Sequence, residues 1–191
     1  MATEVLIKYG TQVRFCVAAS FSATDPATDH TIGSPTAVEI TLSGVVSAAA
    51  RQSAKANLGT PRASRYEVLG AFDFTGETPS ATGHVALYWA PSTSATAANG
   101  NVAGNSGLDA ACPDGALGSI TLAEFLKQCQ YIGELPTHDG AVVQNGLVNP
   151  SFSPSSRYGQ LIVVNNAGDD FEALNTQMAV WFNPIIDEAQ N

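Results

Sequence analysis

The segment RYEVLGAFDF, at positions 65–74, alternates between two faces as a half-buried β-strand does. Successive side chains of an extended chain point to opposite sides, so a period of two in apolar character is the mark of a strand. The face expected to be buried carries Tyr66, Val68, Gly70, Phe72 and Phe74. This segment indicates that sheets, and not helices, form the core.

The same alternation recurs on both sides of this segment. Positions 38–42, 85–89 and 178–182 alternate, and the continuous apolar run at 161–164 is typical of a strand buried on both faces. Further strands are expected at 5–9, 12–17 and 130–135. Within 52–58, alternation favours an extended chain over a helix, although 46–51 is predicted to form a helical turn.

Two short sequence signals predict a turn and a helix. Asn145-Gly146 separates two apolar pairs, which is the strongest short signal for a β-hairpin. The run Thr121-Leu122-Ala123-Glu124 is a capping box, in which the Thr hydroxyl and the Glu carboxylate each bond the other's backbone N–H. A short helix is therefore expected over 122–128.

Many short strands, frequent turns and little helix favour an all-β fold. Long crossings between the strands favour a jelly roll over an up-and-down barrel. No repeat and no linker divides the chain. We therefore expect a single antiparallel β-sandwich domain of jelly-roll type over 1–191, with one or two short helices.

A long neutral stretch interrupts this pattern. Between positions 78 and 123 the chain runs 46 residues with two charged side chains, and 91–118 follows no secondary-structure pattern. Loops of this length are uncommon in compact domains. The stretch is either a mobile linker or a flat surface that contacts another protein. In the second interpretation, the contact residues are Asn99, Asn101, Asn105 and Asp109.

The charge of the chain limits its partners. The net charge is −9 and the sequence pI is about 4.5, which disfavours binding to nucleic acid or to an anionic membrane. Half of the eight basic residues fall in one region, so they form either a secondary protein contact or an ordinary solvated edge. These residues are Arg51, Lys55, Arg62 and Arg65.

The sequence contains no apolar run of 18 residues and no secretory signal pattern at its beginning. Three cysteines without a CxxC motif indicate reduced thiols in a protein made in a cytoplasm, and no disulfide framework is expected.

No catalytic or metal-binding constellation is visible. The three histidines lie more than 50 residues apart, and no nucleophile elbow or phosphate loop is present. The acidic cluster of Asp169, Asp170 and Glu172 follows a turn and is either solvated or a weak cation site. We expect no catalytic residue, no metal and no cofactor.

Exposed aromatic side chains of a β-sandwich can bind sugars by stacking. Tyr88 and Trp181 are the candidates for such a platform, although the core or a protein interface is the competing assignment for both.

Three stretches carry a resemblance to a known class of protein. ARQS (50–53), YWAPS (88–92) and RYGQLIVVN (157–165) resemble segments of small virion structural proteins from tailed bacteriophages. The likeness covers roughly 52–170. It implies a β-rich, non-enzymatic virion protein that decorates or cements the capsid, or that is associated with the tail.

The partners implied by this resemblance are the major capsid or tail protein and further copies of the chain. The alternative is a carbohydrate-binding module on the tail or its fibres that binds a host glycan during adsorption. An enzyme that degrades such a glycan is the third possibility, and it would need two carboxylates in a cleft.

Overall fold

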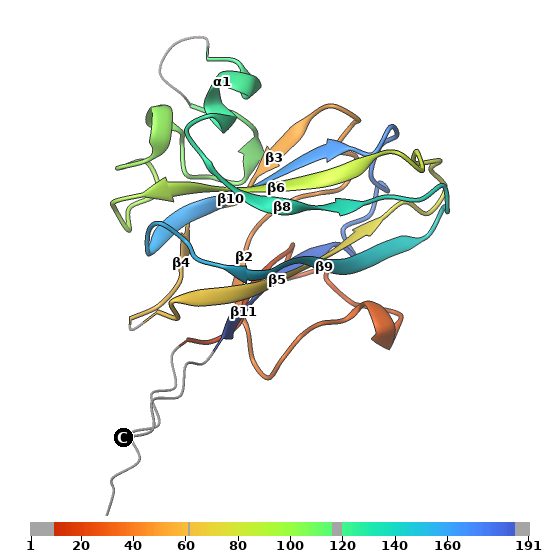
Figure 1. Ribbon diagram of the computed structural model, residues 1–191, viewed down its shortest axis with the longest axis horizontal. Helices are drawn as coiled ribbons and strands as arrows, with labels where there is room; N and C mark the ends of the chain where they lie inside the picture. The colour runs from red at the N-terminus through yellow and green to blue at the C-terminus, as the bar shows by residue number, and fades with distance from the viewer. Residues whose placement is uncertain (1–9, 61, 116–119, 186–191) are drawn as a thin grey trace, which may run out of the picture.

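Two β-sheets packed face to face make up most of the computed structural model (Figure 1). The structure describes residues 10–60, 62–115 and 120–185, so the strand expected at 5–9 lies outside the described residues. The elements are β1 (Val13–Phe15), η1 (Pro26–Thr28), β2 (Thr36–Val38), β3 (Ala50–Gln52), β4 (Ala56–Asn57), β5 (Arg65–Asp73), β6 (His84–Ser92), η2 (Val102–Gly104), β7 (Ala110–Ala111), α1 (Leu122–Leu126), β8 (Gln130–Pro136), β9 (Val143–Phe152), β10 (Tyr158–Asn166) and β11 (Ala179–Ile185).

The strand order is that of a jelly roll. The first sheet, here sheet A, has the order β2-β1-β11-β5-β9, and the second, sheet B, has the order β7-β3-β10-β6-β8 with β4 beside β10. The eight main strands form nested antiparallel pairs: β1 with β11, β3 with β10, β5 with β9 and β6 with β8. Such nesting arises when one long hairpin is rolled into a sandwich. The predicted fold class is confirmed.

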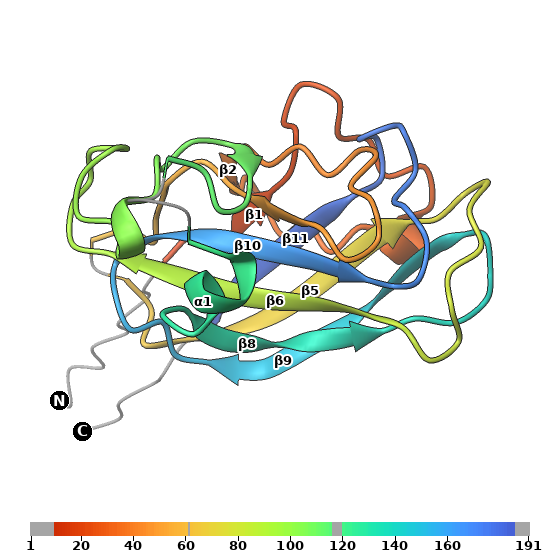
Figure 2. The ribbon, with the colours of Figure 1, turned by 90° about the horizontal axis from the view of Figure 1, so that it is seen from above.

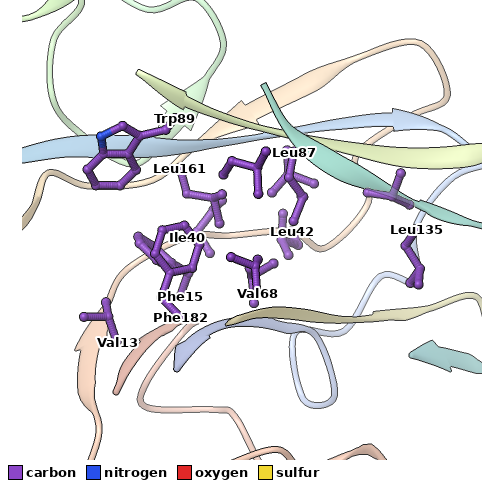
Figure 3. Packing of buried hydrophobic residues seen from close by; sticks show 14 of the residues in the cluster. Val13, Phe15, Ile40, Leu42, Val68, Leu87, Trp89, Leu135, Leu161 and Phe182 are labelled. Carbon is purple, nitrogen blue, oxygen red and sulfur yellow. The ribbon is translucent and has the colours of Figure 1, made fainter. Parts of the chain in front are cut away.

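The main core fills the space between the two sheets (Figure 3). Phe182 of β11 lies at its centre, with ring centroids of four other aromatic residues 5.1–5.9 Å away. Close packing also constrains the backbone. A Cβ on Gly159 would lie 2.5 Å from the ring of Trp89, so only glycine lets β10 pass beneath that indole.

Loop segments cover part of the outer face of each sheet. The segment 17–35 packs Phe21 against Trp181 on sheet A, with ring centroids 5.9 Å apart. On sheet B, α1 lies over β6, and buried Phe125 anchors it there (Figure 2). The capping box is confirmed, because the Thr121 hydroxyl accepts from the Glu124 N–H and the Glu124 carboxylate accepts from the Thr121 N–H. The helix ends at Leu126, slightly earlier than expected.

The hairpin predicted at Asn145-Gly146 is wrong. Both residues lie inside β9, where they pair with Ala71 and Gly70 of β5. The chain reverses earlier, at 137–142, where the side chain of Gln144 bonds the backbone N–H and carbonyl of His138. The long partner strand β5 therefore overrides the local turn preference of the Asn-Gly pair.

The helical turn predicted at 46–51 is replaced by a tight turn and a strand. Ala48 adopts a left-handed φ of 64°, and its N–H donates to the carbonyl of Asn165 at 2.7 Å. Strand β3 then begins at Ala50 and pairs with β10. The strand expected at 38–42 is also shorter, because β2 ends at Val38, although Ile40 and Leu42 are buried in the core.

Candidate functional site

The neutral stretch is folded onto sheet B, and we call residues 93–115 the cap segment. A reciprocal pair of buried amides joins the cap segment to the sheet. Gln52 Nε2 donates to Asn105 Oδ1 at 2.9 Å, and Asn105 Nδ2 donates to Gln52 Oε1 at 2.7 Å. The Gln52 side chain also bonds the carbonyl of Leu108 and the N–H of Asp114. A single buried glutamine thus bonds the cap segment at Asn105, Ser106, Leu108 and Asp114.

Lys55 holds the beginning of the cap segment. Its ammonium donates to the Ser92 hydroxyl at 2.9 Å and to the carbonyls of Thr96 and Asn99 at 2.6 and 2.7 Å. These bonds use all three N–H donors of a lysine. Burial lowers the pKa of the Lys55 ammonium. The side chain is therefore directed at its own cap segment and not at a partner.

A salt bridge fixes Asp109 in the second half of the cap segment. Arg51 Nε donates to Asp109 Oδ1 at 2.7 Å, and the same carboxylate accepts from the backbone N–H and the hydroxyl of Thr41. Burial alone would raise the pKa of the Asp109 carboxyl, but the bonds from Arg51 and Thr41 outweigh burial and hold the pKa below its usual value.

Because the pKa of Asp109 is lowered, the contribution of this carboxyl to the stability of the fold should depend on pH. A carboxyl with a lowered folded-state pKa stabilises the fold above its unfolded pKa and loses that effect as the pH falls through the folded value. We expect Asp109→Asn to reduce the free energy of unfolding by about 1–3 kcal/mol at pH 7. The difference from wild type should shrink below about pH 4. Urea unfolding at several pH values measures it.

Asp139→Asn, at an exposed carboxylate, is the matched control and should change stability little at any pH. A loss for Asp109→Asn that does not depend on pH would contradict the assigned role of the carboxylate.

The structure therefore revises the predicted contact residues. Asn105 is fully buried, which is incompatible with a direct contact to another protein. Asn101 donates its side-chain amide to the carbonyls of Ala97 and Asn105, and Asp109 is engaged by Arg51. Asn99 remains exposed near the tip of the cap segment. The sequence showed a polar neutral stretch, but not that its amides bond the domain itself.

The four basic residues Arg51, Lys55, Arg62 and Arg65 do not form a continuous solvated edge. Arg51 and Lys55 bond the cap segment, and Arg62 donates to the carbonyl of Pro154 at 3.0 Å. Arg65, at the start of β5, is exposed. Arg51, Lys55 and Arg62 thus stabilise the fold.

The assignment of Trp181 to a sugar platform is wrong, because its side chain is fully buried on the outer face of sheet A. The His30 ring lies against it with centroids 5.1 Å apart, and its indole N–H donates to the Thr31 hydroxyl at 3.3 Å. The segment 17–35 covers this face, which alternation within β11 alone could not reveal.

Tyr88 lies on the outer face of sheet B beside a residue that the sequence analysis did not select. Its ring meets that of Tyr131 on β8 at a centroid distance of 5.2 Å and an angle of 60°. Tyr131 is 51% exposed and donates its hydroxyl to Glu134 at 3.1 Å. Burial, followed by the bond to Glu134, raises the pKa of Tyr131 to about 12. This pair makes an aromatic surface with a carboxylate at its side.

A second candidate surface lies on the outer face of sheet A along β9. Leu147 is 50% exposed and pairs with Leu69 of β5, and Val143 lies on the same face. Strand β9 is at the end of its sheet and contains no charged residue. We call Leu69, Val143 and Leu147 the β9 strip.

The three cysteines are free thiols. Burial raises the pKa of Cys16, raises that of Cys112 well above its usual value, and raises that of Cys129 to about 12. A thiol that stays protonated at neutral pH is a poor nucleophile.

In the acidic cluster, Asp169 and Asp170 accept hydrogen bonds from backbone N–H groups. Asp169 accepts from the N–H groups of Thr78 and Asp170, which lower its pKa, and Asp170 accepts from that of Ser47. Within 10–60, 62–115 and 120–185, no three His, Cys, Asp or Glu side chains are grouped so that they could hold a metal ion. In the same part of the chain, no helix is long and apolar enough to cross a membrane.

The chain matches no protein-family model, and neither a curated protein nor a solved structure matches it significantly.

Proposed function

We propose that this protein is a non-enzymatic structural subunit of a tailed-phage virion that decorates or cements the capsid through protein contacts. The resemblance of the stretches at 50–53, 88–92 and 157–165 to phage virion proteins supports the virion as its location. The jelly-roll fold is compatible with this role, because the same architecture serves in viral capsid domains.

The observation that carries the proposal is the β9 strip. An edge strand is usually protected by charges, because its unpaired backbone groups and apolar side chains attract other chains. Strand β9 has Pro150 and an irregular register near Asn149, but its first half is regular and neutral, and it presents Leu147 to solvent. Leu69 and Val143, which are partly buried, extend the apolar surface of Leu147 on this face, and an apolar surface of this kind marks a protein contact.

A contact made by the three side chains of the β9 strip is modest, and its repetition in many copies would make it effective. A decoration subunit occurs in many copies on a symmetric shell, so linked weak contacts between subunit and shell, or between subunits, add up to firm attachment. The low share of charged residues, 13%, keeps the desolvation cost of such contacts small.

Leu147→Asp tests this contact. Purified protein is incubated with particles of the encoding phage that lack the chain, and the bound fraction is measured after sedimentation. Wild type should bind, and Leu147→Asp should reduce binding at least tenfold, because an unpaired carboxylate would be desolvated at the contact.

Leu108→Asp is the matched control, since Leu108 is similarly exposed but lies on the cap segment over sheet B. It should bind like wild type. Absence of the chain from purified wild-type virions, measured by mass spectrometry, would refute the virion role, and equal binding of both variants would refute the contact at β9.

A further inference from the structure

We infer that the outer face of sheet B carries a binding site for a neutral carbohydrate, formed by Tyr88, Tyr131, Glu134, His84 and Asn166. We call these five residues the platform. The site goes beyond attachment to a virion and does not depend on the β9 strip, which lies on the other sheet.

A β-bulge places the two central residues of the platform on one face. In the pairing of β6 with β8, Leu87 pairs with Gly133 but Tyr88 pairs with Tyr131, so Ile132 has no partner residue. Ile132 turns into the core. Residues three apart in a regular strand point to opposite faces, and the extra residue brings Tyr131 and Glu134 to the same face.

Polar side chains from three neighbouring strands extend this aromatic surface. Glu134 Oε2 accepts from the Tyr131 hydroxyl and lies 3.8 Å from His84 Nε2 on β6. His84 Nε2 in turn lies 3.2 Å from Asn166 Nδ2 on β10. The side chains of Glu134 and His84 are 51% and 36% exposed, so they remain open to a ligand.

This combination of groups suits a sugar. The ring faces of Tyr88 and Tyr131 offer apolar contact to the C–H groups of a pyranose, and few rotatable bonds make them a rigid surface. The Glu134 carboxylate accepts hydrogen bonds from hydroxyls, while the imidazole and the amide supply both donors and acceptors. Ligand sites in general combine apolar contact area with a small number of placed polar groups.

Charge and polarity disfavour other ligands. Glu134 and the net charge of −9 repel an anionic ligand such as a phosphate. A purely apolar protein segment would bury the carboxylate, the imidazole and the amide without compensation. An organic cation is the closest competitor, because an aromatic pair beside a carboxylate also attracts cations.

The platform is an open surface, so a single site is expected to bind weakly and multivalent display should strengthen binding. The test uses biotinylated full-length protein on streptavidin against an array of neutral oligosaccharides. We expect binding to at least one neutral glycan, a loss of at least tenfold for Tyr131→Ala, and a clear loss for Glu134→Gln. Leu108→Ala, away from the platform, should bind like wild type.

An NMR titration of the wild-type protein with the free glycan gives a readout that needs no variant. The resonances of Tyr131 and His84 should shift, while those of Trp181 should not, because Trp181 is buried beneath a different face. Choline chloride is titrated in parallel. No neutral glycan binding, glycan binding that Tyr131→Ala leaves unchanged, or shifts with choline but not with glycan would overturn the carbohydrate assignment.

Discussion

Replacing Phe182 with alanine is expected to lower the free energy of unfolding by about 3–5 kcal/mol, because it removes the centre of the core. The ring of Phe182 lies within 5.1–5.9 Å of Phe15, Tyr66, Trp89 and Phe152, measured between centroids. These residues come from both sheets, so the cavity would open at the junction that holds the sandwich together (Figure 3). Urea unfolding monitored by circular dichroism measures the change.

Phe182→Leu is the matched control, since it keeps most of the apolar volume while it removes the aromatic contacts. It should cost about 1–2 kcal/mol, a smaller loss than that of the alanine variant. If alanine and leucine destabilised the protein equally, or if the alanine variant lost less than about 1.5 kcal/mol, the central role of this ring would be wrong.

The sequence was sufficient for the fold class because strand alternation is a local property. The face of 65–74 expected to be buried is indeed buried at Tyr66, Val68 and Phe72. The capping box at Thr121 is equally local and was predicted correctly. The hairpin at Asn145-Gly146 failed because β5 pairs across those residues, and pairing between strands distant in sequence is not encoded in a dipeptide.

The candidate sites were harder to predict for the same reason. The Gln52–Asn105 bond joins residues 53 positions apart, so an apparent contact residue is in fact buried. The alternation within β11 places Trp181 on the outer face of sheet A, where a side chain would be exposed if the segment 17–35 did not cover it. Tyr131 and Glu134 were missed because regular alternation assigns them to opposite faces, and only a bulge brings them together.

The hydrogen bonds between the Gln52 and Asn105 side chains should contribute strongly to the free energy of unfolding. Gln52→Leu should lower the free energy of unfolding by about 3 kcal/mol, because it leaves the Asn105 amide, the Leu108 carbonyl and the Asp114 N–H without their bonds to this side chain. The loss should be concentrated in the cap segment. Backbone amides in 93–115 are expected to exchange hydrogen at least tenfold faster, while amides of β5 and β11 should follow only the global change.

The double variant Gln52→Leu/Asn105→Leu separates the cost of an unsatisfied buried amide from the cost of the changed side-chain shape. Replacing both partners by apolar groups removes the unsatisfied amide, so the double variant should be more stable than the sum of the two single losses predicts. Strict additivity, or exchange that accelerates uniformly over the whole domain, would show that the amide pair does not hold the cap segment.

Because Tyr88 also packs against the cluster beneath α1 and the cap segment, a released cap segment should loosen the platform as well. In the Gln52→Leu variant, glycan binding should therefore weaken together with the protection of 93–115.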